Sequence, residues 1–267
     1  MELVCSGTSD AVSYLDVLRF YMVGGSEFAN FMDSAARFKL KVGTVGLAER
    51  IHEDGGAEIA FASPVKSITD HGDRVIVTTT EGRELRSRAV ISTLPMNVIN
   101  QVRFTPPLPA GVVEAAELRH AGRGAKVFLK VAGDVGKVAT VAPGRPLNYL
   151  MTYAQAPYHS LLVAFSSEPE KIDFIDQTAL ASELELHLPG LTLLDTFSHD
   201  WNSDSLALGT WASYRPHWAR DLLDSFQVAS GRIHFASGDH GEGWRGTIDG
   251  AIGAGTRAAA AIKVQLS

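Results

Sequence analysis

Apolar residues follow two different periods along this chain. From Ala11 to Met32 they recur at helical spacing, and Gly24-Gly25 divides this stretch into two predicted helices. A further helix is predicted from Val45 to His52. Runs of apolar and β-branched residues then predict a block of strands at residues 57–61, 65–68, 74–80, 83–86 and 89–93.

The second half of the chain follows a stiff connector, Thr105-Pro106-Pro107-Leu108-Pro109, which is the best candidate for a crossing between domains. Beyond it we predict a second sheet with flanking helices. Its strands are expected at 126–131, 148–153, 161–165 and 193–198, and its helices at 175–187 and 217–226. Together the two halves predict an α/β (α+β) fold.

The C-terminal stretch combines a strand at 232–236, a glycine-rich turn that contains Gly238-Asp239, and a helix from Ile248 to Lys263. The first N–H groups of a helix have no intrahelical partner and carry partial positive charge, so they suit a phosphate or an electron-rich ring. This layout therefore indicates a cofactor site. An ordinary strand–loop–helix connection is the alternative.

Composition narrows the class of protein. The chain has 267 residues, 45% of them hydrophobic, which is enough for one large or two modest domains. A net charge of −6 argues against a nucleic-acid partner, and the single cysteine, Cys5, fits a reducing cytoplasm. We expect no membrane span, no signal peptide at Met1-Glu2-Leu3-Val4, and no metal site, because the histidines lack ligand spacing.

Seven short motifs occur in the order found in one known family. They are Val42-Gly43-Thr44, Ser63-Pro64-Val65-Lys66-Ser67-Ile68, Val90-Ile91-Ser92-Thr93-Leu94-Pro95, Phe104-Thr105-Pro106-Pro107-Leu108-Pro109, Gly124-Ala125-Lys126, Trp201 with Trp211, and the C-terminal block. With them the chain resembles the C-terminal two-thirds of the flavin-dependent amine oxidases, which include monoamine, polyamine and nicotine-degrading oxidases.

The resemblance implies the C-terminal portion of an FAD-binding Rossmann-like domain with an interleaved antiparallel-sheet substrate domain. Residues 1–37 and 113–203 would form the substrate domain, and residues 38–112 and 204–267 the FAD-binding domain. The Gly-x-Gly-x-x-Gly turn that opens this family is absent from the sequence. A second chain is therefore expected to supply that half, unless the chain is a fragment.

The resemblance also implies a cofactor set for FAD. Val65 would pair its backbone with the adenine, Gly238 and Asp239 would meet the pyrophosphate and ribityl part, and Ile248 would offer its N–H to the flavin carbonyl beside N1. The complete set is Val65, Trp201, Gly238, Asp239, Gly246, Thr247, Ile248 and Ala251. Thr210 stands where covalent monoamine oxidases have cysteine, so FAD is expected to bind non-covalently.

Three residues are candidates for the chemistry. Lys126 would hold a water against flavin N5, and Trp211 would form one wall of an aromatic cage around the amine. Thr247 occupies the position of the second wall, where a hydroxyl would open the cage to a bulkier or hydrogen-bonded substrate. The alternatives are a solvent-facing Lys126 beside Lys130 on one strand face, and core packing for Trp211 and Trp201. His240 either touches the cofactor or is a solvated loop residue.

The function that the resemblance implies is oxidation of a C–N bond of a small amine. Hydride would pass to flavin N5, water would hydrolyse the iminium, and oxygen or another acceptor would reoxidise the flavin. Two alternatives stay open. One is a related flavin desaturase or porphyrinogen-type oxidase, and the other is a non-catalytic partner subunit of a flavoprotein.

Overall fold

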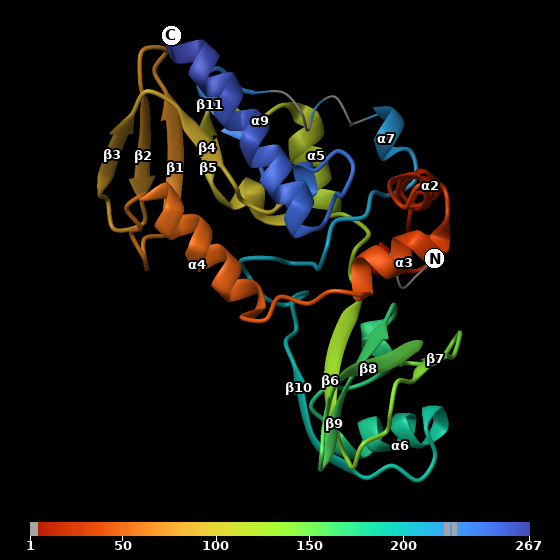
Figure 1. The fold of residues 1–267 in the computed structure, drawn as a ribbon. Coiled ribbons are helices and arrows are strands. Elements are labelled where there is room, and N and C mark those ends of the chain that lie inside the picture. The colour runs from red at the N-terminus through yellow and green to blue at the C-terminus, as the bar shows by residue number, and fades with distance from the viewer. Residues whose placement is uncertain (1–4, 222–224, 226–228) are drawn as a thin grey trace.

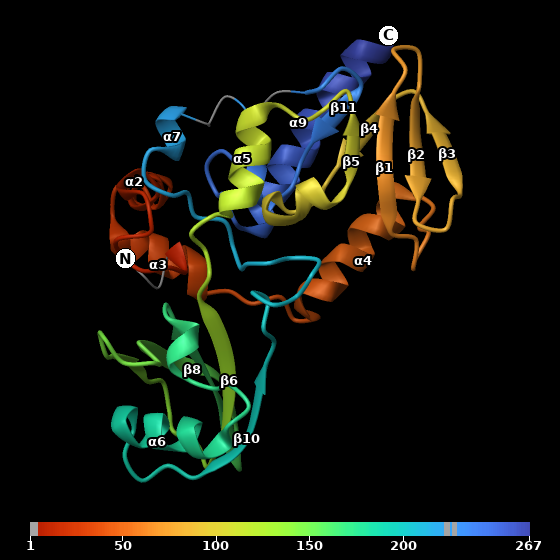
Figure 2. The same ribbon diagram turned by 180° about the vertical axis from the view of Figure 1, so that it is seen from behind.

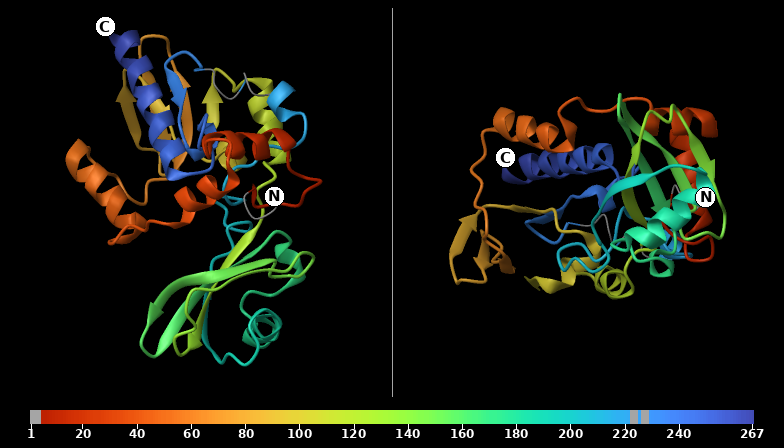
Figure 3. Two further views of the ribbon diagram at one scale, coloured as in Figure 1. Left: turned by 45° about the vertical axis from the view of Figure 1, so that its right-hand side comes forward. Right: turned by 90° about the horizontal axis from the view of Figure 1, so that it is seen from below.

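The computed structural model describes residues 5–221, 225 and 229–267. Figure 1 shows two bodies: an upper one with two small sheets and most of the helices, and a lower one with a single sheet and α6 (Gln177–His187). The view from behind and the side view show that the strands β6 (Ala125–Ala132) and β10 (Leu193–Ser198) run between the two bodies (Figures 2 and 3).

Three helices form the first part of the chain. They are α2 (Tyr14–Val23), α3 (Phe28–Ala36) and α4 (Gly43–Gly55). The Ser13 hydroxyl accepts a hydrogen bond from the N–H of Leu15 and so caps α2, which ends at Gly24. The predicted division of this stretch at Gly24-Gly25 is therefore confirmed.

The first sheet has the order β3-β2-β1-β5. Its strands are β1 (Val65–Asp70), β2 (Val75–Thr79), β3 (Glu84–Ser87) and β5 (Arg103–Thr105), with β1 parallel to β5 and antiparallel to β2. The strand predicted at residues 57–61 is wrong. Those residues have no strand to pair with, and Phe61 is 82% exposed, so neither ladder hydrogen bonds nor burial stabilise an extended segment there.

A second, two-stranded parallel sheet joins β4 (Val90–Ser92) to β11 (Ile233–Phe235), and α9 (Ile248–Leu266) packs against both strands. Between β4 and β5 lies the 3-10 helix η1 (Met96–Gln101). Helix α5 (Ala110–Leu118) follows the proline-rich connector and packs against η1 in the same core as β1 and β11. The chain therefore leaves the upper body after α5, and the division into two domains stays a prediction.

The lower body is an antiparallel sheet of order β10-β6-β9-β8-β7, completed by β7 (Ala139–Val141), β8 (Tyr149–Ala156) and β9 (His159–Ser166). Strand β6 alternates strictly: Val127, Leu129 and Val131 are fully buried. Because successive side chains point to opposite faces, Lys126 and Lys130 share the other face, as predicted.

Helical segments follow the strands β9 and β10 in this half of the chain. Helix α6 covers the buried face of the lower sheet with Leu180 and Leu184, and the 3-10 helix η2 (Pro169–Lys171) precedes it. The helix predicted at 217–226 is observed as α7 (Trp218–Asp221), and the rest of that prediction lies partly outside the described residues. Within the described ranges, no helix has both the length and the apolar character needed to cross a membrane.

Candidate functional site

A cavity of about 480 Å³ lies where the two bodies meet. Its walls come from the end of β4, the start of β6, the 201–211 segment and the 3-10 helix η3 (Gly238–His240). The lining residues are Thr93, Pro95, His120, Ala125, Lys126, Trp201, Ala207, Gly209, Thr210, Trp211, Ser237, Gly238 and Asp239. Five of the predicted site residues therefore share one cavity although they span more than a hundred positions of the chain.

A larger cavity of about 880 Å³ lies beside the start of α9. Lys126 and Trp211 line it too, together with Gly246, Thr247 and Ile248. Its remaining walls come from α2, α3, the segment between α3 and α4, and Tyr153 of β8. Lys126 and Trp211 thus border both cavities, and these two candidates for the chemistry form the connection between them.

Lys126 projects from the polar face of β6 into these spaces. Its Nζ lies 5.2 Å from the ring centroid of Phe165 and 6.0 Å from that of Trp211. Desolvation by the surrounding protein lowers its pKa, and no hydrogen bond or ion pair of this ammonium is seen within the described ranges. Its donors are therefore available to a water molecule or a ligand.

The Trp211 segment is held by very close backbone packing. The N–H of Thr210 donates to the carbonyl of Gly122 at 2.9 Å, and a Cβ on Gly122 would lie 2.0 Å from the carbonyl oxygen of Trp211. On the other side Gly246, with φ +78°, packs so that an added Cβ would lie 3.1 Å from Cβ of Trp211. The edge of the Trp211 ring meets Phe165. Trp211 is a cavity wall, not a residue of one of the buried cores.

Thr247 is the N-cap of α9. Its hydroxyl donates to the carbonyl of Trp244 at 2.7 Å and accepts from the N–H of Gly250 at 3.2 Å. The single proton of the hydroxyl is therefore already used. The N–H of Ile248 belongs to the first turn, so it has no intrahelical acceptor and lies at the cavity wall.

Gly238 and Asp239 connect the two parallel strands to α9. The buried Asp239 accepts a hydrogen bond at Oδ2 from the N–H of Met96 at 2.7 Å, which joins η3 to the segment after β4. The carbonyl of Gly238 accepts from the N–H of Gly246 at 2.8 Å. One carboxylate oxygen thus has a structural partner, while the residue still lines the smaller cavity.

The other predicted residues lie as follows. Trp201 is 51% exposed, lines the smaller cavity and meets the ring of His199 edge-on, so it is not a core residue. Val65 opens β1 and packs against the upper core, and Ala251 lies in the first turns of α9. Neither of these two is among the residues that line the two cavities, and their roles stay predictions.

Two histidines border this region. The sequence motifs did not indicate His120, which is buried and lines the smaller cavity. Its Nδ1 accepts from the N–H of Gly122 at 3.1 Å, and burial lowers its pKa, so the neutral ring carries its proton on Nε2. His240 is only partly buried, its Nδ1 lies 2.9 Å from Oγ of Ser237, and burial lowers its pKa as well.

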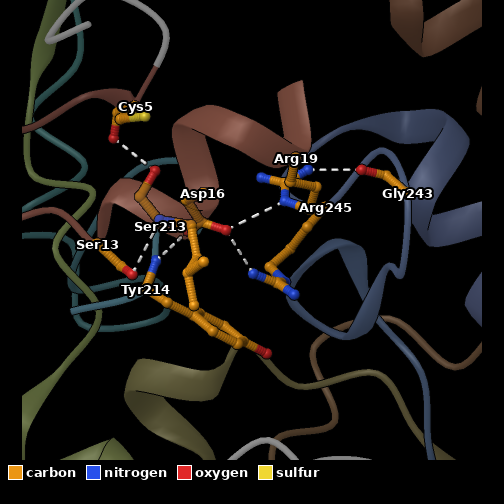
Figure 4. Close-up of polar contacts among 9 residues, drawn as sticks. Cys5, Ser13, Asp16, Arg19, Ser213, Tyr214, Gly243 and Arg245 are labelled. Carbon is orange, nitrogen blue, oxygen red and sulfur yellow. Dashed lines mark hydrogen bonds and ion pairs between the residues drawn. The ribbon is translucent and has the colours of Figure 1, made fainter. Parts of the chain in front are cut away.

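A buried ionic network that the sequence motifs did not indicate joins three segments around the site (Figure 4). We call Asp16, Arg19, Tyr214 and Arg245 the Asp16 network. Asp16 Oδ1 accepts from Arg19 Nε at 3.1 Å and from Arg245 Nη1 at 2.7 Å, and its Oδ2 accepts from the N–H of Tyr214. The Arg245 guanidinium lies 3.5 Å above the Tyr214 ring. Helix α2 is thereby fixed to the segments that carry Trp211 and Thr247.

Cys5 lies next to this network (Figure 4), and its carbonyl accepts a hydrogen bond from the Ser213 hydroxyl at 2.6 Å. The thiol is fully buried; burial, reinforced by the Asp16 carboxylate, raises its pKa from 9.0 to about 11. The folded state therefore holds the thiol proton more tightly than the unfolded chain does.

Cys5 is expected to make the protein less stable in alkaline solution. The stabilisation is complete below pH 9 and is lost as the pH rises from 9 to about 11, by about 2–3 kcal/mol. Urea unfolding as a function of pH checks this. In the Cys5→Ala variant, the free energy of unfolding should fall less steeply with pH between pH 9 and about 11. The same pH dependence in the variant and the wild type would show that the Cys5 thiol does not cause it.

Within the described ranges, no group of three or more His, Cys, Asp or Glu side chains could hold a metal ion. The two cavities are lined by Lys126, aromatic side chains, His120, Asp239 and the start of α9. Such a set suits an organic ligand with a flat ring and hydrogen-bond acceptors.

Comparisons with known proteins agree with this geometry. The family model for flavin containing amine oxidoreductase matches residues 3–263. A pseudooxynicotine dehydrogenase of a Pseudomonas species is 34% identical over 250 residues, which is 92% of this chain and 50% of the relative. A nicotine dehydrogenase of Pseudomonas putida is 30% identical, over 100% of this chain and 56% of the relative.

Solved structures show the same fold. A putrescine oxidase variant superposes with a TM-score of 0.74 at 18% identity, over 84% of this chain and 53% of that one. Cyclohexylamine oxidase from Brevibacterium oxydans gives a TM-score of 0.67 at 20% identity, over 84% and 53%. The chain spans about half the length of the relatives it matches, and the α/β architecture agrees with a portion of the FAD-dependent oxidase fold. By sequence and by fold, the chain belongs to the family of flavin-containing amine oxidoreductases, whose cofactor is FAD.

Proposed function

We propose that this chain forms the substrate-facing part of an enzyme that oxidises a C–N bond of a small amine. FAD would be bound non-covalently, and a second chain would supply the dinucleotide-binding half. The observation that carries the proposal is the position of Lys126 and Trp211, which border two cavities, the larger of which lies beside the start of α9. Family membership supports the reaction class.

The residues around the cavities fit a flavin. The ammonium of Lys126 and the N–H of Ile248 are both donors, and the start of α9 favours negative charge. Cys5, the single cysteine of the chain, is buried away from both cavities, which supports non-covalent binding. FAD would supply the oxidising power for removal of a hydride from the carbon next to the amine nitrogen, with oxygen or another acceptor as the final oxidant and water hydrolysing the iminium product.

Three residues of the chain would have different roles in the reaction. Lys126 would donate a hydrogen bond to a water and hold it at the reacting end of the site, since its Nζ lies beside Phe165 and Trp211 where the two cavities meet. Trp211 would orient the amine and exclude bulk water. Ile248 would direct its N–H at the acceptor atoms where negative charge develops.

Thr247 makes the second wall small. Because its single proton is donated to the carbonyl of Trp244, the hydroxyl offers the substrate no hydrogen-bond donor, and the side chain contributes a methyl group and space. Two relatives are named for pseudooxynicotine and nicotine, which are amines that carry a pyridine ring. Both observations support a ring-bearing amine that is bulkier than a simple alkyl amine.

Replacing Lys126 with methionine tests the proposal. In the assembled enzyme, stopped-flow absorbance is expected to show flavin reduction or reoxidation at least about tenfold slower, because the water-holding donor is lost. Lys130→Met is the matched control, since Lys130 lies on the same face of β6 but does not line the cavities. Unchanged rates in the Lys126 variant would remove this residue from the mechanism.

Amine turnover itself separates the proposal from its rivals. A yellow complex that releases peroxide with an amine supports C–N oxidation. A yellow complex without amine turnover would instead favour a desaturase-type relative or a non-catalytic subunit.

A further inference from the structure

The ring of His120 is held in place by backbone from two neighbouring segments. Its Nδ1 accepts a hydrogen bond from the N–H of Gly122 at 3.1 Å, and a Cβ added to Gly209 would lie 3.0 Å from Cε1. The N–H of His120 donates to Oδ1 of the buried Asn97 at 2.9 Å, and Nδ2 of Asn97 donates to the carbonyl of Leu208 at 2.9 Å. A rotation of the ring would have to break the Nδ1 hydrogen bond or displace the backbone at Gly209.

The other ring nitrogen of His120 has no protein partner. Nε2 carries the proton of the neutral ring, because Nδ1 is an acceptor. No hydrogen bond of Nε2 is seen to the residues that the structure describes, and Nε2 is not one of the fully enclosed atoms without a partner, such as Oγ of Ser92. His120 is 2% exposed and lines the smaller cavity. Its unpaired N–H donor therefore opens to that cavity.

A carboxylate oxygen opens to the same cavity. Asp239 is 9% exposed, and in the described part of the chain only its Oδ2 has a partner, the N–H of Met96 at 2.7 Å. Its Oδ1 is not among the enclosed atoms either, and Asp239 lines the smaller cavity together with His120. The charge of Asp239 acts on His120 and opposes the lowering of the histidine pKa by burial. A buried donor and a buried acceptor thus border one space.

This pair of groups selects a ligand by its chemistry. A chain of hydroxyls can accept a hydrogen bond from Nε2 of His120 and donate one to Oδ1 of Asp239. A phosphate offers mainly acceptors, and the Asp239 carboxylate would repel it. An ammonium offers only donors and would leave the His120 donor unpaired. The smaller cavity therefore suits a neutral part of a ligand that carries hydroxyls.

The flavin ring also has a carbonyl and an N–H on one edge. The proposed function places that end of the ring beside Ile248, which lines the larger cavity and not the smaller one. The ribityl chain of FAD, which joins the ring to the diphosphate, carries hydroxyls and no charge. It is the part of the cofactor that matches a donor beside a carboxylate.

We propose that His120 and Asp239 form a hydroxyl-binding subsite for the ribityl chain of FAD, in which Nε2 of His120 is the donor. The inference rests on the proposed function and adds His120 to the residues that hold the cofactor. Because backbone fixes the ring, the donor has its direction before the cofactor binds.

Two substitutions of His120 separate cofactor binding from a structural role. The side-chain oxygen of His120→Asn reaches about as far as Nδ1, so it keeps an acceptor for Gly122 and loses the donor in the cavity. In the enzyme assembled with its partner chain, fluorescence titration should show a Kd of FAD about tenfold higher. The amide nitrogen of His120→Gln reaches the Nε2 position, so this variant should keep the Kd within about threefold of wild type. The reverse order would assign His120 a structural role only and overturn the subsite.

His187→Asn is the matched control. Both ring nitrogens of His187 have partners inside the protein, Oγ1 of Thr140 at 2.6 Å and the carbonyl of Leu147 at 2.7 Å. His187 lines neither cavity, so this variant should leave the Kd of FAD unchanged. An equal rise of the Kd in the His187 and His120 asparagine variants would overturn the subsite.

FAD analogues that each lack one ribityl hydroxyl identify the group that His120 binds. The wild-type enzyme should bind one of these analogues about tenfold more weakly than FAD. His120→Asn should not weaken the binding of that analogue further, because the partner of Nε2 is already absent. Independent losses with every analogue would place His120 against another part of the cofactor and overturn the ribityl assignment.

Nuclear magnetic resonance of the wild-type enzyme, labelled with ¹⁵N in histidine, needs no substitution. The His120 signal is assigned through the contact of its ring with Gly122. It should show a neutral ring with the proton on Nε2, and this proton should exchange with water at least about tenfold more slowly when FAD is bound. A proton on Nδ1, or exchange that FAD does not change, would overturn the subsite.

Two further outcomes separate this inference from the proposed function. A raised KM for the amine with an unchanged Kd of FAD in His120→Asn would place the substrate against His120. That result would overturn the ribityl subsite and leave the proposed function intact. Failure of the assembled wild-type enzyme to bind FAD would overturn the proposed function, and the subsite with it.

Discussion

Replacing Asp16 with alanine is expected to lower the free energy of unfolding by about 3–5 kcal/mol, because two largely buried guanidinium groups would lose their carboxylate. The side chains of Arg19 and Arg245 are only 12% and 9% exposed, so water cannot replace the lost partner. The N–H of Tyr214 would also lose its acceptor. Urea unfolding monitored by circular dichroism measures the change.

Asp33→Ala provides the control for a carboxylate at the surface. Asp33 pairs with Arg37, and the two side chains are 45% and 59% exposed, so the loss should stay below about 1 kcal/mol. Asp16→Asn should fall between the two, since it keeps one acceptor oxygen and removes the charge. Equal effects of the Asp16 and Asp33 alanine variants would show that the Asp16 network does not act as a buried ionic unit.

Gly122→Ala is expected to destabilise the protein by about 3 kcal/mol or more and to move Trp211. The new Cβ would lie 2.0 Å from the carbonyl oxygen of Trp211, and this neighbour is backbone that cannot rotate away. The Thr210 N–H to Gly122 carbonyl hydrogen bond would therefore break or lengthen. Chemical unfolding and the tryptophan emission spectrum check both effects.

A glycine in open space gives the matched comparison. Gly255 lies inside α9 with nothing within 4 Å of an added Cβ, so Gly255→Ala should stabilise the protein by about 0.5–1 kcal/mol. A tolerated alanine at position 122 would mean that the Trp211 segment can shift, and that this close packing does not fix the cavity wall.

Local patterns were sufficient to predict the elements whose stability is decided locally or by one buried face. The alternation of β6 correctly placed Lys126 and Lys130 together, and the division of the first helices at Gly24 was visible from glycine alone. The strand predicted at residues 57–61 was wrong because its stability would depend on a distant part of the chain. Its apolar alternation resembles a strand, but strand formation requires a neighbouring strand, which local sequence does not reveal.

The site was only partly accessible from sequence. Motif order brought Lys126, Trp211, Gly238 and Thr247 together as candidates, and the structure places them around two adjoining cavities. The Asp16 network was not predictable, because Asp16 lies 198 and 229 residues from Tyr214 and Arg245. His120 also gave no signal, since it lies in a short connection without periodicity, and its importance comes from burial alone.

The double use of the Thr247 hydroxyl constrains how this protein can diverge or be redesigned. Valine has nearly the same shape and would leave the volume of the pocket unchanged, yet it would remove the cap of α9 and cost about 1 kcal/mol. Serine would keep the cap and enlarge the pocket. A substitution at Thr247 that removes the hydroxyl therefore changes the lining of the pocket and the stability of α9 at the same time. Redesign of the pocket without loss of helix stability requires substitutions at its other lining residues.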